Sequence, residues 1–237
     1  MKKFLKILLR IVGVLLLMGL IGFGILFAIY NEPIPEGKSG PAADALAEKM
    51  LKAVNNEAYK NTRHIEWSFL DGTHRYHWDK ENGKVQVRWD NYEVNLNLNN
   101  PSKSEVLENG AVVIDDSKTD LVTTAVNYFN NDSFWLVAPF KVLDKGTERS
   151  IVTLADSSEA LLVKYSSGGT TPGDTYLWKL LPNGFPQSYQ MWVKVIPIGG
   201  LEASWDDWKI MESGVALPAT HRIGSITMDM GVVKAYN

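Results

Sequence analysis

Two histidines and an aspartate stand close together in the segment HRYHWD (residues 74–79), and these residue types can ligate a metal ion. The alternating polarity around them predicts an extended strand. Side chains three positions apart in a strand point to opposite faces, so His74 and His77 cannot share one ion, although His77 and Asp79 share a face. Four histidines and no cysteine leave too few partners for a zinc site. The sequence therefore predicts no metal, no cofactor, and cross-strand polar pairing for these side chains.

Patterns for nucleophilic or acid–base catalysis are equally sparse. Neither G-x-S-x-G nor H-E-x-x-H occurs. Asp206 and Asp207 are neighbours in an expected strand and point apart, whereas Asp115 and Asp116 precede an expected helix and suit its N-terminus. The stretch SGGTTPGD (167–174) has the composition of a hairpin loop. We expect a protein that is not an enzyme, with an envelope hydrolase as an alternative, because sites built from distant residues leave no local pattern.

Aromatic residues form the pattern with the most chemical content. They occupy the apolar phase of several expected strands: Trp67, Trp78, Trp89, Tyr92, Tyr176 and Trp178. One interpretation is ordinary core packing, because large aromatic side chains are usually buried. The other is that they line an apolar pocket, because a curved sheet with few helices leaves its concave side unfilled.

These side chains must be positioned mainly by β-hairpins. Residues 64–99 alternate in polarity and are divided by turn pairs at Asp71-Gly72, Asn82-Gly83 and Asp90-Asn91, which predicts a meander of four antiparallel strands. Apolar residues at helical spacing predict helices over 42–55 and 117–130. Further strands are expected at 148–155, 159–166, 174–181, 187–196, 201–210 and 219–229.

About ten strands and two helices, without βαβ alternation, predict a mainly β (α+β) fold. We expect one strongly curved antiparallel sheet or open barrel, with the helices against its concave face.

The N-terminus carries a membrane signal. The 20 residues from Ile11 to Tyr30 are uncharged, which matches the ~30 Å hydrocarbon core of a bilayer. Basic residues precede this run: Lys2, Lys3, Lys6 and Arg10. This flank predicts an uncleaved single-pass anchor with its N-terminus in the cytoplasm of a bacterium. A cleaved secretory signal is the alternative, although the run is long and no A-x-A pattern follows it.

Three regions follow from this reading. Residues 1–30 are the basic flank and anchor, 31–41 (NEPIPEGKSGP) a spacer, and 42–237 one domain in the periplasm or extracytoplasmic space. The part after the anchor carries 20 basic and 27 acidic residues, an excess of negative charge that argues against nucleic acid as a partner.

The order of parts resembles the periplasmic lipoprotein-carrier superfamily, which includes outer-membrane lipoprotein carriers and their receptors. A short helix precedes a meander, and a mid-chain helix leads into the segment FWLVAPF (134–140). The resemblance implies an unclosed barrel with a helical lid around an apolar cavity for acyl chains, and no catalytic motif. A permanent anchor departs from the soluble carriers and favours a fixed acceptor, sensor or bridge.

We therefore expect a membrane-anchored domain that binds a lipid or a lipoprotein acyl chain. The expected cavity-lining residues are Trp67, Trp78, Trp89, Tyr92, Trp178, Phe134, Trp135 and Phe140. The alternative is an envelope sensor or assembly factor that binds a protein partner at its surface. A cavity of several hundred Å³ supports the first hypothesis, whereas a filled core supports the second.

Overall fold

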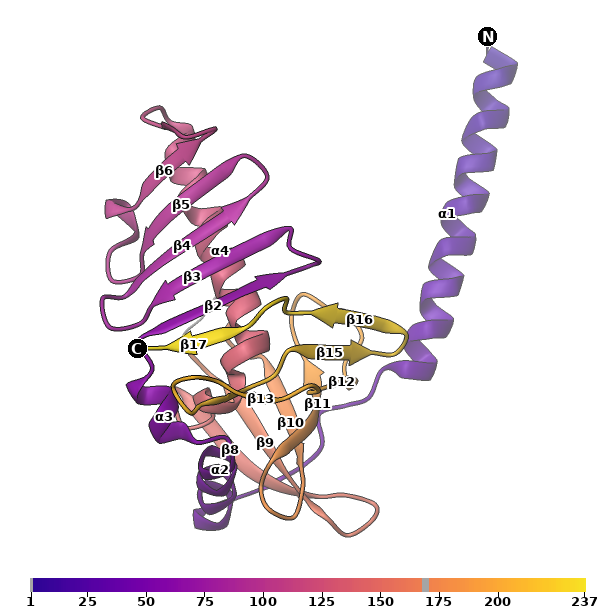
Figure 1. Ribbon diagram of the computed structural model, residues 1–237. Helices are drawn as coiled ribbons and strands as arrows, with labels where there is room; N and C mark the ends of the chain where they lie inside the picture. The colour runs from indigo at the N-terminus through magenta and orange to yellow at the C-terminus, as the bar shows by residue number, and fades with distance from the viewer. Residues whose placement is uncertain (1, 168–170) are drawn as a thin grey trace.

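A computed structural model describes residues 2–167 and 171–237 of the chain. Residues 168–170, in the expected hairpin loop SGGTTPGD, lie outside the described residues. The fold is a mixed α+β arrangement of antiparallel sheets, and an apolar helix leads away from it (Figure 1). No sheet closes into a barrel within these two ranges.

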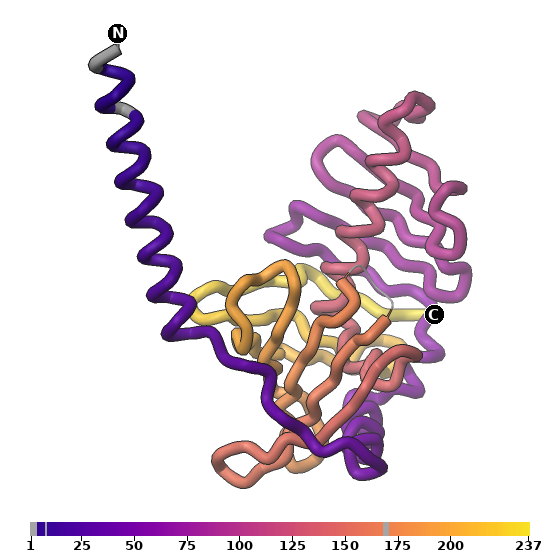
Figure 2. The backbone as a smooth tube through the Cα atoms, turned by 180° about the vertical axis from the view of Figure 1, so that it is seen from behind, coloured from indigo at the N-terminus to yellow at the C-terminus, as the bar shows by residue number. Residues whose placement is uncertain are grey.

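The first helix, α1 (Lys2–Tyr30), projects away from the body of the protein (Figures 1 and 2). The most apolar 18 residues within its stretch Phe4–Tyr30 have a mean hydropathy of 2.7, and none of them is buried in the fold. A helix of 29 residues at ~1.5 Å per residue exceeds the thickness of the hydrocarbon core. The helix is therefore long and apolar enough to span a membrane, a property that a signal sequence shares.

The expected spacer at 31–41 is bonded to the domain at both of its ends. Asn31 and Glu32 bond to the body of the protein directly after α1, and a short strand, β1 (Lys38–Ser39), pairs with Ile151 and Ser150. Proline and glycine stop the helix as predicted, but the extended backbone they favour is what a sheet edge can pair with.

One large sheet contains the predicted meander. Its order is β17-β2-β3-β4-β5-β6-β7. The four meander strands are confirmed, with tight turns between them. The strands of this sheet are β2 (His64–Phe69), β3 (His74–Asp79), β4 (Lys84–Trp89), β5 (Tyr92–Asn97), β6 (Glu105–Glu108), β7 (Ala111–Val112) and β17 (Lys234–Tyr236).

A second large sheet has the order β1-β8-β9-β10-β11-β12, and two short hairpins complete the strands. The strands of the second sheet after β1 are β8 (Thr147–Thr153), β9 (Glu159–Tyr165), β10 (Thr175–Leu180), β11 (Pro186–Trp192) and β12 (Leu201–Ser204). The hairpins are β13 (Lys209–Ile210) with β14 (Ala216–Leu217), and β15 (Thr220–Ile223) with β16 (Ile226–Asp229).

The division into two sheets corrects the expectation of a single continuous one. The expected strand 219–229 is a hairpin that turns at Gly224, whose φ of +57° suits glycine. Beside it, Pro218 has no N–H to donate to a ladder. The hairpin contacts both large sheets, through β12 and through β2, so hydrogen bonding is interrupted where the sequence predicted one sheet.

The two predicted helices are present. The first, expected over 42–55, is confirmed as α2 (Pro41–Ala53), and a further short helix that was not predicted, α3 (Asn56–Asn61), follows it after Asn55, which adopts φ +60° and accepts a hydrogen bond from Ala58 N. The second, α4 (Ser117–Val137), continues past residue 130 and runs into a 3₁₀ turn, η2 (Ala138–Lys141). Another 3₁₀ turn, η1, covers Pro101–Lys103.

One hydrophobic core joins the two large sheets, and α4 is the element that spans it (Figure 1). Phe129 of α4 packs against Trp67 and Trp78 of the seven-stranded sheet. One to two turns later, Trp135 packs against Tyr189 of the six-stranded sheet. The C-terminal half of α4 therefore determines how the space between the sheets is filled.

His221 makes the core sensitive to pH. Its ring is fully buried against Trp205, Nδ1 lies 3.0 Å from the carbonyl oxygen of Ser204, and Nε2 has no partner among the described residues. Burial lowers the pKa of His221 to about 4, while its bond to Ser204 opposes the shift. The side chain is therefore uncharged in the folded protein at neutral pH.

The free energy of unfolding should fall as the pH drops through the range in which this histidine is protonated in the unfolded chain but not in the folded protein. Because the unfolded pKa is ~6.5, the unfolded state binds the extra proton, and stability is lost as pH falls from ~6.5 towards about 4. We expect a loss of about 2 kcal/mol between pH 7.5 and 5.0 in urea unfolding. The His221→Gln variant should lack most of this loss. An equal pH slope in both proteins would contradict the prediction.

Candidate functional site

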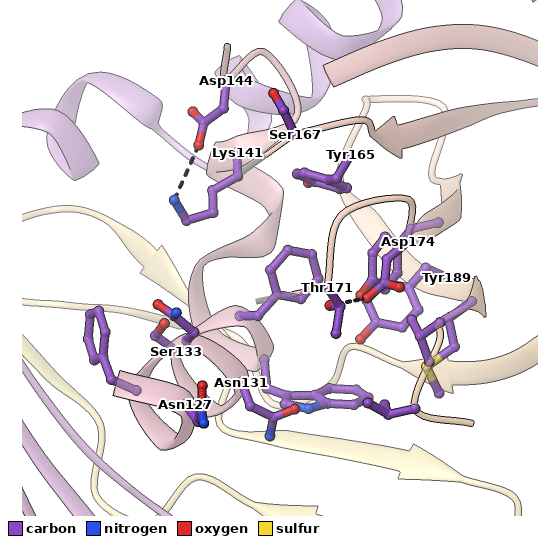
Figure 3. Close-up of a pocket in the computed structure, with 18 of the residues that line it drawn as sticks. Asn127, Asn131, Ser133, Lys141, Asp144, Tyr165, Ser167, Thr171, Asp174 and Tyr189 are labelled. Carbon is purple, nitrogen blue, oxygen red and sulfur yellow. Dashed lines mark hydrogen bonds and ion pairs between the residues drawn. The ribbon is translucent and has the colours of Figure 1, made fainter. Parts of the chain in front are cut away.

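The candidate site is a cavity of about 740 Å³ beside the C-terminal half of α4 (Figure 3). Its walls come from α4, from the turn between η2 and β8, and from the β9–β10–β11 part of the six-stranded sheet. Trp78 and Leu98 reach it from the seven-stranded sheet. The cavity therefore lies between the two large sheets, beside α4.

Aromatic rings form a continuous wall on one side. Phe134 lies 4.8 Å from Tyr176 and 5.5 Å from Tyr165, measured between ring centroids. Tyr189 lies 5.0 Å from Tyr176 and 5.7 Å from Trp135. These tilted and edge-to-face arrangements are the favoured ones for aromatic pairs. The wall is thus both apolar and rigid, because each ring is held by its neighbours.

The tyrosine hydroxyls of this wall are uncharged. Burial raises the pKa of Tyr165 and Tyr189 well above the ordinary value, and it raises the pKa of Tyr176, with a smaller contribution from Asp174. The hydroxyl of Tyr165 is buried and has no hydrogen-bond partner in the described ranges. An unpaired buried hydroxyl is costly, so a ligand with an acceptor could satisfy it.

Polar side chains line the cavity at several places, as Figure 3 shows. Lys141 pairs with Asp144 at 3.2 Å. Asp174 is buried, accepts a hydrogen bond of 2.5 Å from Thr171 Oγ1, and accepts another of 3.0 Å from the backbone N–H of Lys194. The cavity therefore combines an aromatic wall with several separate polar groups, an arrangement that suits an amphiphilic ligand.

Three of the eight residues predicted to line a cavity lie on its wall: Trp78, Phe134 and Trp135. The other five do not belong to the lining of this cavity. Trp67 stacks on Tyr76, and Phe140 stacks on Tyr59 with centroids 4.1 Å apart. Trp89 and the half-buried Tyr92 contact each other near the N-terminal half of α4. Trp178 packs between Tyr189 and Trp205.

The physical reason is that strand phase identifies the covered face of a sheet but not what covers it. α4 lies over Trp67 and Trp89 and packs against them through Phe129 and Tyr128. Of the three tryptophans Trp67, Trp78 and Trp89, Trp78 borders the cavity, next to Phe129 of α4. The position of α4 depends on contacts between distant segments, which no local pattern reveals.

Several cavity residues were missed from the sequence. Tyr165, Tyr189 and Met191 line it, as do Asn127 and Asn131 of α4. A signal for two of them was available in the strand pairing: Tyr189 is the cross-strand partner of Trp178, and Met191 that of Tyr176. Cross-strand partners share a face, so the aromatic stripe of one strand points to its neighbours in the next.

The histidines of the HRYHWD segment point apart, as their spacing predicted. His74 is buried, and its Nδ1 lies 2.7 Å from Oδ2 of Asp132. His77 is exposed, and its Nε2 lies 3.3 Å from Nδ1 of His64 on the neighbouring strand. Within residues 2–167 and 171–237, no group of three His, Asp or Glu side chains could hold a metal ion.

The paired acids also have local partners. Asp115 accepts hydrogen bonds from the backbone and the hydroxyl of Ser117, the first residue of α4, which agrees with the predicted role at a helix N-terminus. Asp206 bonds to Ser204 and to Arg222. These bonds lie outside the cavity.

Comparisons with protein-family models, with curated proteins and with solved structures found no match for this chain. The resemblance to the lipoprotein-carrier superfamily therefore stays a prediction. The case for a function depends on the geometry of the cavity and on α1.

Proposed function

We propose that this protein is a membrane-anchored extracytoplasmic domain that binds an acyl chain of a lipid or lipoprotein in the cavity beside α4. The observation that carries the proposal is a cavity of about 740 Å³ with a continuous aromatic wall. Ligand sites in proteins typically measure ~300–1,000 Å³ and are mostly apolar. Each CH₂ group that such a wall removes from water contributes ~0.8 kcal/mol to binding.

The polar groups of the lining support an amphiphilic ligand over a plain hydrocarbon. Lys141 and Asp144 lie together at one part of the lining, and Thr171 and Asp174 lie together at another, as Figure 3 shows. A chain with a polar head can place its tail against the rings and its head beside these groups. This arrangement leaves few buried polar groups unpaired.

We also propose that the two large sheets together form an interrupted open barrel. Three contacts support it: the bridge between Asp206 and Thr220 next to β12, the hairpin β15–β16, and the bond from Ser68 N to Met230 O next to β2. Together they connect the edge of the six-stranded sheet to the seven-stranded sheet. The cavity would then lie on the concave side of one interrupted surface.

We also propose an orientation of the chain in the membrane. A span at α1, with the basic residues Lys2, Lys3, Lys6 and Arg10 before it, supports an N-terminus in the cytoplasm of a bacterium. The β-rich domain would then lie in the periplasm or its equivalent. A reporter fused after Asn237 should be active only if it is exported.

Native mass spectrometry of the purified protein, with co-purified lipid as the readout, tests the proposal. The Ile196→Trp variant should reduce lipid occupancy about tenfold, because a larger side chain on the wall displaces about two CH₂ groups worth ~0.8 kcal/mol each. Ile210→Trp is the matched control, since Ile210 is exposed and lies outside the lining. If none of the three proteins (the unaltered protein, Ile196→Trp and Ile210→Trp) carries lipid, the result would favour binding of a protein partner at the surface.

A further inference from the structure

The end of α1 is bonded directly to the domain, without a free linker. Glu32 N donates to Gly199 O at 3.0 Å, and Gly199 N donates to Oδ1 of Asn31 at 2.9 Å. The indole of Trp192 donates to Glu32 O at 2.7 Å, and Gln190 Nε2 donates to the Glu32 side chain at 3.0 Å. Two of these bonds come from the loop between β11 and β12 and two from β11 itself, and together they hold this part of the sheet against the two residues that follow α1.

The loop is shaped for this contact. Gly200 has φ +84°, and a Cβ placed there would lie 2.7 Å from Cβ of Glu32. A residue with a side chain would therefore be strained and would push the post-helix segment away. The glycine pair at the end of the loop lets the two backbones approach closely.

The hairpin β15–β16 lies at the same place. Asp206 is the antiparallel partner of Thr220, and Arg222 N donates to Ser204 Oγ at 3.0 Å. This register places residues 224–226 beside residues 200–202. Figures 1 and 2 both draw the tip of this hairpin next to the end of α1.

Apolar side chains are exposed on this face. Val195 in the β11–β12 loop is 72% exposed, and Ile226 at the hairpin tip is 64% exposed. The loop also forms part of the cavity, through Val193, Val195 and Ile196. The same short segment is therefore in contact with the cavity on one side and with the end of the membrane helix on the other.

We propose that the face formed by residues 193–200 and 223–226 lies on the membrane leaflet from which α1 emerges, and that the cavity takes its lipid directly from that leaflet. The partner is thus the bilayer surface, and the inference rests on the proposed lipid-binding function. The domain carries excess negative charge, so the contact is apolar rather than electrostatic. Exposed apolar side chains at the end of a span are stabilised by insertion into the acyl boundary.

Single cysteine labels on the full chain test the contact, since the protein has no native cysteine. The variants Val195→Cys, Ile226→Cys and Ile210→Cys would each carry an environment-sensitive fluorophore in phosphatidylcholine vesicles. We expect labels at 195 and 226 to be quenched by brominated acyl chains and protected from iodide. The control label at 210, where the native side chain is 82% exposed on β13, should show the opposite. Iodide quenching at all three positions would overturn the membrane contact.

Lipid uptake then separates this inference from the proposed function. Ile226→Asp should slow uptake of a pyrene-labelled phospholipid from the same vesicles about tenfold, because one buried isoleucine contributes about that factor. Ile210→Asp is the matched control and should leave uptake unchanged. Binding of the same lipid from octyl glucoside micelles should be equal in all proteins. Equal uptake by both variants would overturn loading from the leaflet, whereas no binding from micelles would overturn the proposed function instead.

Discussion

Replacing Trp178 with alanine should lower the free energy of unfolding by about 3–5 kcal/mol. The side chain has no exposed surface, and its ring contacts Tyr189 and Trp205 at centroid distances of 4.9 and 5.0 Å. It lies in β10, between β9 and β11, where neighbouring strands are held in register on both sides. The backbone cannot collapse into the space of an indole, so a cavity would remain. Urea unfolding followed by circular dichroism measures the loss.

The matched comparison is Phe134→Ala, which removes a ring that is only partly buried and borders the cavity. Its surroundings are already open on one side, so less packing is lost and the stability change should be smaller. Its effect on bound lipid should be larger, because the ring belongs to the aromatic wall. A loss below about 1 kcal/mol for Trp178→Ala would show that the packing around β10 is loose.

Trp89, like Trp178, is a core residue that does not line the cavity. Both fall on the apolar phase of their strands, yet Trp89 is buried against Tyr92 and Tyr128 and does not border the cavity. Substitution of Trp89 therefore reports on core packing alone. Strand phase predicted that both tryptophans face inward, and only the position of α4 decides which inward-facing rings meet open space.

Local chemistry was sufficient to predict the meander. Its turns need backbone with positive φ, and the structure has φ +54° at Asp71, +59° at Gly83 and +46° at Asp90. Aspartate and glycine tolerate this region better than most residues, so the turn pairs were visible in the sequence. Alternating polarity between the turns then determined which side of each strand is buried.

Contacts between distant segments explain what could not be predicted. The bond between Glu32 and Gly199 joins residues far apart in the chain, and no sequence pattern around either residue identifies the other as its partner. The hairpin at Gly224 was hidden because residues 219–229 alternate like one strand. The cavity likewise lies between two sheets, and this placement is a tertiary property that leaves no local signal.

The burial of Asp132 was not predicted, although the sequence contains a signal for it. It is almost fully buried in α4, although its segment reads as polar. Its spacing from Ala125, Phe129 and Leu136 places it on the buried stripe of the helix, so helical periodicity could have found it. A carboxyl on such a stripe requires partners on the facing sheet.

Those partners make Asp132 the second position where a large effect is expected. The hydroxyl of Tyr76 donates to Oδ2 of Asp132 at 2.5 Å, and Nδ1 of His74 lies 2.7 Å from the same oxygen. Asn131 donates to Oδ1 at 2.8 Å. Burial, together with Asp132, raises the pKa of Tyr76, so this hydroxyl stays protonated and can act as a donor.

The Asp132→Ala variant should lose about 3–5 kcal/mol of unfolding free energy at pH 7.5, because the buried hydroxyl of Tyr76 loses its acceptor and the buried ring of His74 loses its partner. Tyr76→Phe provides the second arm of a double-mutant cycle. In the Tyr76→Phe background the cost of Asp132→Ala should shrink by about 1–3 kcal/mol, since the Tyr76 hydroxyl is already gone. Asp120→Ala, at an exposed aspartate in the first turn of the same helix, is the control and should cost less than about 1 kcal/mol. Equal costs of Asp132→Ala in both backgrounds would show that Tyr76 and Asp132 are not coupled.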